Sequence, residues 1–264
     1  MANRTNTDYK MCCSVLSEEL RAQFNIDNLS PIDPFAIARN IPHLSIVLHP
    51  LGESISGLCI KQSNYSLIAI NSGQTFGRQR FTLSHEFYHL YFDDQAGTII
   101  CPVGISPAEA SKMNQIEREA DSFASFFLLP RLALRNEISS KGISPTCELE
   151  DALLCSIIQI EQKYGISRKA LLVRLEDEGA LSPKQIKWLS SNIKQNARRL
   201  GFSTSLYDRS CGTSAKKASG QYIDLISELL ANSVISRGKA EQYLADGFRD
   251  DIHVVELEGD EIFD

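Results

Sequence analysis

The stretch GRQRFTLSHEFYH, residues 77 to 89, ends in the pentapeptide that decides the predicted fold. On an α-helix, residues i and i+4 lie on the same face, so His85 and His89 can direct two imidazoles at one metal ion. Glu86 lies between them and is placed to take a proton from a water molecule on that metal. Zn²⁺ is the expected ion, because a catalytic zinc site has three protein ligands and keeps a fourth position for water.

The surroundings of this motif are apolar, with Phe81, Leu83, Phe87, Leu90 and Phe92 on several sides of the expected helix. Such a helix is usually buried. Two buried histidines and a buried glutamate would be costly without a partner. The pattern therefore favours a metal site over a surface helix that carries two unconnected histidines.

A third ligand is expected in the segment NQIEREADSFASFFLLP, residues 114 to 130, which has apolar residues at helical spacing. Glu117 and Asp121 are four residues apart and share a face, so Glu117 is the predicted ligand and Asp121 is predicted to orient a ligand imidazole. Glu119 is the alternative ligand. It lies about 200° around the helix from Glu117, so both cannot face the metal, and we expect a solvated charge there. Pro130 is expected to close the helix.

With these residues the chain resembles the ImmA/IrrE family of metallopeptidases. The resemblance rests on residues 77 to 89 and 117 to 130, with support from SPIDPFAIARNI (residues 30 to 41) and INS (residues 70 to 72), and it covers roughly residues 25 to 135. In that family the residues matching His85, His89 and Glu117 hold zinc, and the residue matching Glu86 is the catalytic base.

Two positions depart from the family pattern. Tyr88 stands where a glycine is common, and Asp93 stands where a further histidine is common. Neither is expected to touch the three ligands or the base. Both departures therefore bear on substrate preference, since Tyr88 could narrow the cleft.

The motif and the resemblance together predict a zinc-dependent endopeptidase in which Glu86 assists the attack of zinc-bound water on a peptide bond. Family members cleave helix-turn-helix transcriptional repressors, so the resemblance implies such a repressor as the protein substrate. A further donor is needed for the oxyanion, and Tyr88, Tyr91, Arg78 and Arg80 are candidates by proximity in sequence alone. The alternative function is a non-proteolytic regulator or sensor that binds a transcription factor or DNA, although the intact Glu86 argues for catalysis.

The predicted fold class is α+β, with a zincin-like metallopeptidase domain over residues 1 to 142. Two short helices are expected within residues 14 to 42, with Ser30-Pro31 as a helix start. The runs LSIVLH, ISGLCIK and YSLIAIN within residues 44 to 72 are expected strands, the last two forming a hairpin. An exposed edge strand could pair with an extended substrate. A long loop is expected over residues 93 to 111.

A helical, helix-turn-helix-like region is expected over residues 143 to 200, followed by a linker and C-terminal helices with an acidic tail over residues 201 to 264. The expected helices are residues 148 to 164, a segment from residue 168, and residues 183 to 199; the linker is residues 201 to 218, and Ser236 is a possible cap in the last helix pair. Direct DNA binding is not expected, because the candidate recognition helix SRKALLVRLEDEG has few base-reading donors and the net charge is -6.

Composition favours a cytoplasmic protein. No run of 18 apolar residues predicts a membrane span, and the first residues lack a signal-peptide pattern. The seven cysteines are scattered and form no CxxC pair, which favours reduced thiols. A further hypothesis is that one thiolate caps the zinc and silences the enzyme, but nothing in the sequence selects one of the cysteines.

Overall fold

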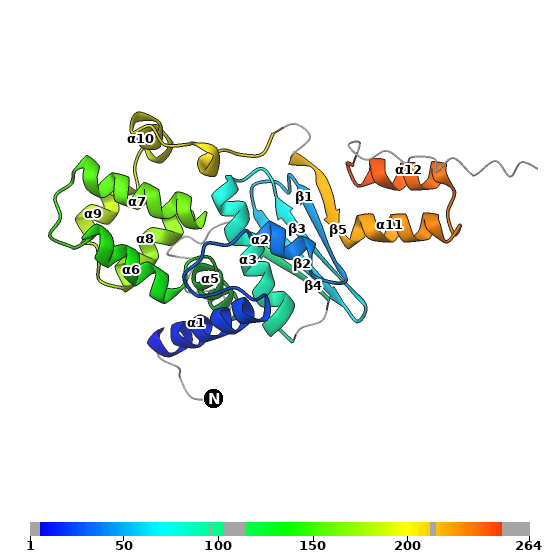
Figure 1. The fold of residues 1–264 in the computed structure, drawn as a ribbon, viewed down its shortest axis with the longest axis horizontal. Helices are drawn as coiled ribbons and strands as arrows, with labels where there is room; N and C mark the ends of the chain where they lie inside the picture. Colours follow the sequence, from blue (N-terminus) through cyan, green and yellow to red (C-terminus); the bar gives the residue numbers. More distant parts are fainter. Residues whose placement is uncertain (1–5, 95–96, 103–114, 212–214, 250–264) are drawn as a thin grey trace, which may run out of the picture.

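The centre of the protein is a mixed β-sheet built from the three apolar runs that the sequence predicts as strands. The computed structural model describes residues 6–94, 97–102, 115–211 and 215–249. The five strands lie in the order β4-β2-β3-β1-β5, and helices flank the sheet in an α+β fold (Figure 1). Their bounds are β1 Leu44–His49, β2 Ile55–Gln62, β3 Tyr65–Asn71, β4 Gly97–Pro102 and β5 Lys217–Gly220.

The predicted hairpin is confirmed. Strands β2 and β3 pair antiparallel, with Gln62 opposite Tyr65 at the turn. Strand β1 pairs parallel to β3 on its other side. The edges are β4, which pairs antiparallel to β2, and β5, which pairs antiparallel to β1.

The helix that carries the histidine motif, α3 (Phe76–Phe92), packs against β2 and β3. Helix α5 (Gln115–Leu128) lies on the other side of α3, and α1 (Asn6–Gln23) packs on α5. Phe87 of α3 meets Phe127 of α5 edge to face, with ring centroids 5.7 Å apart. The apolar residues around the motif thus bury α3 between the sheet and α5, which is the environment predicted for it.

Helix α2 packs on α3 and β1 in this central part, α6 to α10 lie on one side of it, and α11 and α12 lie on the other (Figure 1). Their bounds are α2 Pro34–Arg39, α6 Arg131–Lys141, α7 Asp151–Tyr164, α8 Arg168–Asp177, α9 Pro183–Leu189, α10 Ile193–Arg199, α11 Gln221–Ala231 and α12 Arg237–Asp246. One cluster of buried apolar side chains includes residues from Cys13 to Ala197, so α6 to α10 share the core of the sheet and α3. Helices α11 and α12 form a separate small cluster beyond β5.

The N-terminal helices differ from the prediction. Helix α1 begins at Asn6 rather than near residue 14, because packing against α5 supports a longer helix than its own pattern indicates. Helix α2 is capped by Asp33, whose side chain accepts a hydrogen bond from the Phe35 amide, with Pro34 at the first helical position. The prediction of a cap at Ser30-Pro31 is wrong, because the Ser30 hydroxyl donates instead to Asp27 at 2.7 Å.

Two predicted irregular segments contain strands. The expected loop from residue 93 contains β4, and the expected linker contains β5; each is held by backbone pairing to a strand distant in sequence. The part of the expected loop over residues 103–114 lies outside the described residues, as does the acidic tail. The helix expected over residues 183–199 is instead the pair α9 and α10, because Asn192 takes the left-handed conformation, with φ of 51°, between them. Ser236 caps α12 as predicted.

Within the described residues, every helix is too short or too polar to span a lipid bilayer.

Candidate metal centre

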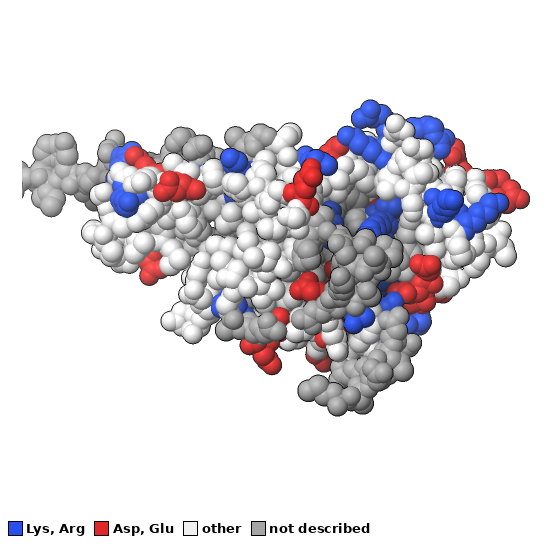
Figure 2. All heavy atoms as spheres, turned by 180° about the vertical axis from the view of Figure 1, so that it is seen from behind, with Lys and Arg blue, Asp and Glu red and all other residues white. Residues whose placement is uncertain are grey.

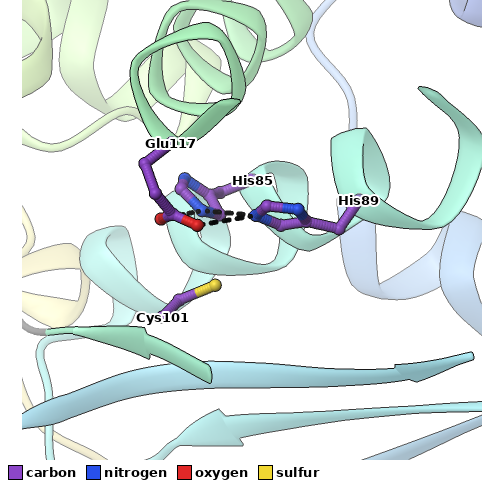
Figure 3. A group of neighbouring side chains, drawn as sticks. All are labelled: His85, His89, Cys101 and Glu117. Atoms are coloured by element: carbon purple, nitrogen blue, oxygen red, sulfur yellow. Dashed lines mark hydrogen bonds and ion pairs between the residues drawn. The ribbon is translucent and has the colours of Figure 1, made fainter. Parts of the chain in front are cut away.

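Three of the predicted site residues converge between α3 and α5. His85 and His89 lie one turn apart on α3, and Glu117 lies in the first turn of α5 opposite them (Figure 3). The two Nε2 atoms are 3.2 Å apart, and Glu117 brings one carboxylate oxygen to 3.3 Å from His85 Nε2 and the other to 3.4 Å from His89 Nε2. Both histidines are buried. The side chains thus present two imidazole nitrogens and a carboxylate to one point.

Each imidazole is oriented by its own carboxylate. His85 Nδ1 lies 2.9 Å from Asp121, and His89 Nδ1 lies 3.0 Å from Asp93. An ionised carboxylate only accepts hydrogen bonds, so each Nδ1 is the donor and the Nε2 of the same ring faces Glu117 as the atom that could bind a metal. Metal-binding histidines in proteins are usually held in this way.

The donor spacing fits zinc. Ligand bonds of about 2.0–2.1 Å in a tetrahedral arrangement place neighbouring donor atoms about 3.3–3.4 Å apart. The three distances among His85, His89 and Glu117 lie close to that spacing, at 3.2, 3.3 and 3.4 Å. A fourth donor is present, because Cys101 of β4 brings its sulfur within 4.8 Å of the other ligand atoms. Nitrogen, oxygen and sulfur donors together suit zinc better than magnesium or calcium.

The electrostatics of the group also favour a cation. Burial opposes a charge on His85, but Asp121, Cys101 and Glu117 outweigh it and raise the pKa of His85 well above its usual value. Burial likewise opposes a charge on Glu117, but the two histidines lower its pKa to about 2. Positive charge at the shared point of these side chains is therefore stabilised.

Glu86 follows His85 on α3 and is fully buried. Burial raises the pKa of Glu86, and the neighbouring His85 and His89 act in the opposite direction. Neither carboxylate oxygen has a hydrogen-bond partner among the described residues. The close approach to β2 depends on Gly57, since a Cβ atom there would lie 2.7 Å from Glu86 Oε1.

Comparison with known proteins agrees with this geometry. The sequence model of the IrrE N-terminal-like domain, a peptidase family, matches residues 44–176. The chain belongs to this family. A search of curated proteins found no match. The matched segment runs from β1 into α8 and therefore includes all the residues of the metal centre. Membership supports a metallopeptidase-like function for this IrrE-like chain.

A cavity of about 280 Å³ opens beside the metal centre of the IrrE-like domain. His85, Glu117 and Asp121 form one wall. The other walls come from α1, β2, α8 and the start of α3, where Arg78 lies over the Phe81 ring at 5.2 Å. The cavity thus combines apolar walls with basic side chains next to the candidate metal ligands.

Three of the four side chains predicted to stabilise an oxyanion point elsewhere. The Tyr88 hydroxyl donates to Glu119 at 2.6 Å, and the Tyr91 ring packs on Phe24. The Arg80 guanidinium donates to the Gly165 carbonyl at 3.1 Å and also to Ile32 and Asp33. None of these three side chains lines the cavity. Arg78 remains as the candidate that lines the cavity.

Three further expectations are corrected. Glu119 lies away from the metal ligands as predicted, but it is no free charge, because it accepts hydrogen bonds from Tyr88 and Gln115. Tyr88 packs between α3 and α5 and does not line the cavity, so it does not narrow the cleft. Asp93 contacts His89 directly, contrary to our expectation that it touches none of the three ligands.

Three residues of the centre escape prediction from the sequence. Asp93 follows His89 by four residues, the same helical spacing that selects Asp121, so this signal is present in the chain. The sequence shows Gly57 only as a glycine within a predicted strand. Its contact with Glu86 depends on how α3 packs against β2. Cys101 cannot be chosen among the seven cysteines, because its position depends on how β4 pairs.

Proposed function

We propose that this chain is a zinc-dependent endopeptidase that cleaves a specific protein substrate, with His85, His89 and Glu117 as metal ligands and Glu86 as the base. The observation that carries the proposal is the convergence of three donors at tetrahedral spacing, with the fully buried Glu86 carboxylate on the residue next to His85. A non-proteolytic sensor could use the same ligands, but it would have no need for the Glu86 carboxylate. The costly burial of this group therefore supports catalysis.

Zinc, when bound, polarises a peptide carbonyl and lowers the pKa of a water molecule. Glu86 then takes a proton from that water and delivers it to the leaving amine. The pKa of Glu86 is raised by burial, which brings the group closer to the range in which a carboxylate exchanges protons at neutral pH. Asp121 and Asp93 keep both imidazoles in the tautomer that leaves Nε2 free to bind.

Strand β4 offers a place for the substrate backbone. It is the last strand of the sheet, and among the described residues it pairs only with β2. An extended peptide can add to such an edge through backbone hydrogen bonds. Because Cys101 of β4 lies in the metal centre, a peptide paired there would pass beside the ligands. The adjoining cavity would accept one substrate side chain, with Arg78 available to an oxyanion or to an acidic group.

We propose a helix-turn-helix repressor as the substrate, on the basis of the family resemblance, and the cytoplasm as the site of action. Direct DNA binding by this chain is the less favoured function. The candidate recognition helix α8 packs its Leu171, Leu172 and Leu175 side chains into the core, and its Arg174 donates to backbone carbonyls at the C-terminal end of α5. Figure 2 shows basic side chains in small groups mixed with acidic ones over the helical part.

The test combines metal content with cleavage. We expect about one zinc per chain in the wild type, lost in Glu117→Ala and kept in Glu119→Ala, which removes a matched carboxylate that points away from the centre. Glu86→Gln should keep the zinc and lose cleavage of the helix-turn-helix repressor that the wild type cleaves. A wild type that binds no zinc when zinc is supplied would overturn the proposal. Indiscriminate degradation of casein would contradict the narrow substrate.

A further inference from the structure

Cys101 is the fourth donor of the metal centre. Its side chain is 1 % exposed, and its sulfur points from β4 toward the two imidazoles and the Glu117 carboxylate (Figure 3). The ligand atoms of these four residues all lie within 4.8 Å of one another. The candidate metal centre therefore offers one more donor than a catalytic zinc site uses.

The backbone holds this sulfur in place. Cys101 lies opposite Gly57 in the pairing of β4 with β2, and its carbonyl accepts a hydrogen bond from the Ser56 hydroxyl at 3.1 Å. Strand alternation turns Ile100, which is 57 % exposed, outward and turns Cys101 inward toward α3. The position of the thiol thus follows from the register of the sheet.

The chemistry of the two ligand sets differs. Two histidines and a glutamate leave the fourth position of a tetrahedral zinc open to water, as in catalytic sites. The same three residues with a cysteine thiolate complete four protein ligands, as in structural sites that bind no water. A thiol that coordinates zinc is deprotonated, even where burial alone keeps it protonated.

We propose that Cys101 is the fourth metal ligand in the resting protein and keeps the centre closed to water. This inference rests on the proposed zinc site but not on a particular substrate. Opening of the metal centre would need no electron transfer. The sulfur–metal bond would break and the thiolate would take a proton from solvent, which leaves the fourth coordination position available to water. A movement of β4 away from α3 would open the centre, and β4 is an edge strand with β2 as its paired neighbour. It is also the strand to which we assign the substrate backbone, so substrate pairing and opening would act on one element.

The chain provides a matched control in Cys59. This cysteine is also fully buried, lies on the neighbouring strand β2, and is outside the group of metal donors among the described residues. Cys59→Ala and Cys101→Ala therefore remove the same side chain from adjacent strands, and only one of them removes a candidate ligand.

The test is a titration of the metal-free full-length protein with Co²⁺, followed by absorption spectroscopy. A thiolate ligand gives a charge-transfer band in the near ultraviolet. We expect this band in the wild type and in Cys59→Ala, and we expect Cys101→Ala to bind cobalt without it, at least about tenfold more weakly. Circular dichroism shows whether each variant is folded, and the wild-type spectrum is decisive even if Cys101→Ala does not fold.

Wild-type protein that binds cobalt without the band, or Cys101→Ala that keeps it, would overturn the inference and leave the proposed zinc site intact. Wild-type protein that binds no cobalt would overturn both the inference and the proposed zinc site.

Closure is tested separately with acetohydroxamate, which binds the metal only when the fourth coordination position is open. If the wild type is open about a tenth of the time or less, Cys101→Ala should bind acetohydroxamate at least about tenfold more tightly, and equal affinity would overturn the closing role.

Discussion

Gly57 is the residue whose missing side chain lets Glu86 lie against the sheet. A Cβ at this position would lie 2.7 Å from both Glu86 Oε1 and Thr82 Cγ2 and 3.1 Å from the Ala69 carbonyl. The backbone contact limits how far the strand can yield, so the added methyl group must displace Glu86. The position of the base is therefore set by a neighbour that takes no part in the chemistry.

We predict that Gly57→Ala keeps the metal and lowers kcat by about a hundredfold, because a displacement of about 1 Å at a reacting group has an effect of that size. Metal analysis and an assay of peptide-bond cleavage measure the two quantities. Gly238→Ala is the control, since a Cβ there meets nothing within 4 Å. Full activity in Gly57→Ala would show that Glu86 tolerates displacement.

Asp93 supports the metal centre through His89. Its side chain is 4 % exposed and accepts the Nδ1 hydrogen bond at 3.0 Å, whereas the Asp121 side chain that orients His85 is 38 % exposed. Because its hydrogen bond is shielded from water, Asp93 should contribute strongly to the orientation of the imidazole. In the family pattern, a histidine is common at the position of Asp93.

We expect Asp93→Ala to weaken zinc binding by about 10- to 100-fold, the usual effect of losing a carboxylate that orients a ligand histidine. Competition with a chromogenic chelator gives the affinity. Asp94→Ala, a change at the exposed neighbouring residue, should leave it unchanged. Unaltered zinc affinity in Asp93→Ala would show that Asp93 does not support zinc binding and acts only where α3 ends.

At the scale of elements, a buried ion pair joins α7 to α8. Arg168 donates to both carboxylate oxygens of Glu161, the Tyr207 hydroxyl donates to the same carboxylate, and both charged residues are nearly inaccessible to solvent. Burial raises the pKa of Glu161 while Arg168 opposes that shift. The pair therefore fixes α8, which forms one wall of the cavity.

We predict that Glu161→Ala lowers the free energy of unfolding by about 3–5 kcal/mol, because it leaves the Arg168 charge buried without its carboxylate partner. Urea denaturation measures the change, and Glu161→Ala with Arg168→Ala should cost less than the sum of the single variants. Asp151→Ala, which breaks an exposed pair with Arg199, should have little effect. Additive effects at Glu161 and Arg168 would contradict their coupling.

At the scale of the whole molecule, the metal centre joins parts of the chain that are distant in sequence. Its donors come from α3, α5 and β4. An ion held by all three elements stabilises the folded state, by about 2.7 kcal/mol when free zinc is about 100 times its dissociation constant. Removal of the ion leaves buried polar groups around Glu117 without their common partner.

Metal removal should therefore lower the melting temperature, and added zinc should restore it. Differential scanning calorimetry with and without a chelator measures the shift. Glu86→Gln should show the same shift as the wild type, since Glu86 is not among the ligands, and Glu117→Ala, which loses the ion, should show no shift. Equal melting temperatures with and without zinc would contradict the linkage between the ion and the fold.

Local spacing in the sequence is enough to predict the parts of the site that lie on single helices. The geometry of an α-helix brings residues four apart together, and this spacing alone pairs His85 with His89 and Glu117 with Asp121. The same rule applies to Asp93. Strands β1 to β3 are also predictable, because their apolar runs are continuous and their turn is short.

How these helices and strands come together depends on contacts in the tertiary structure. Strands β4 and β5 have little pattern of their own and form because distant strands satisfy their backbone hydrogen bonds. The place of Cys101 in the metal centre and of Gly57 beneath Glu86 depends on that pairing, as does the cavity between α3, α5 and α8. Contacts between segments far apart in sequence carry no period that a local pattern can show, so a single sequence does not select them.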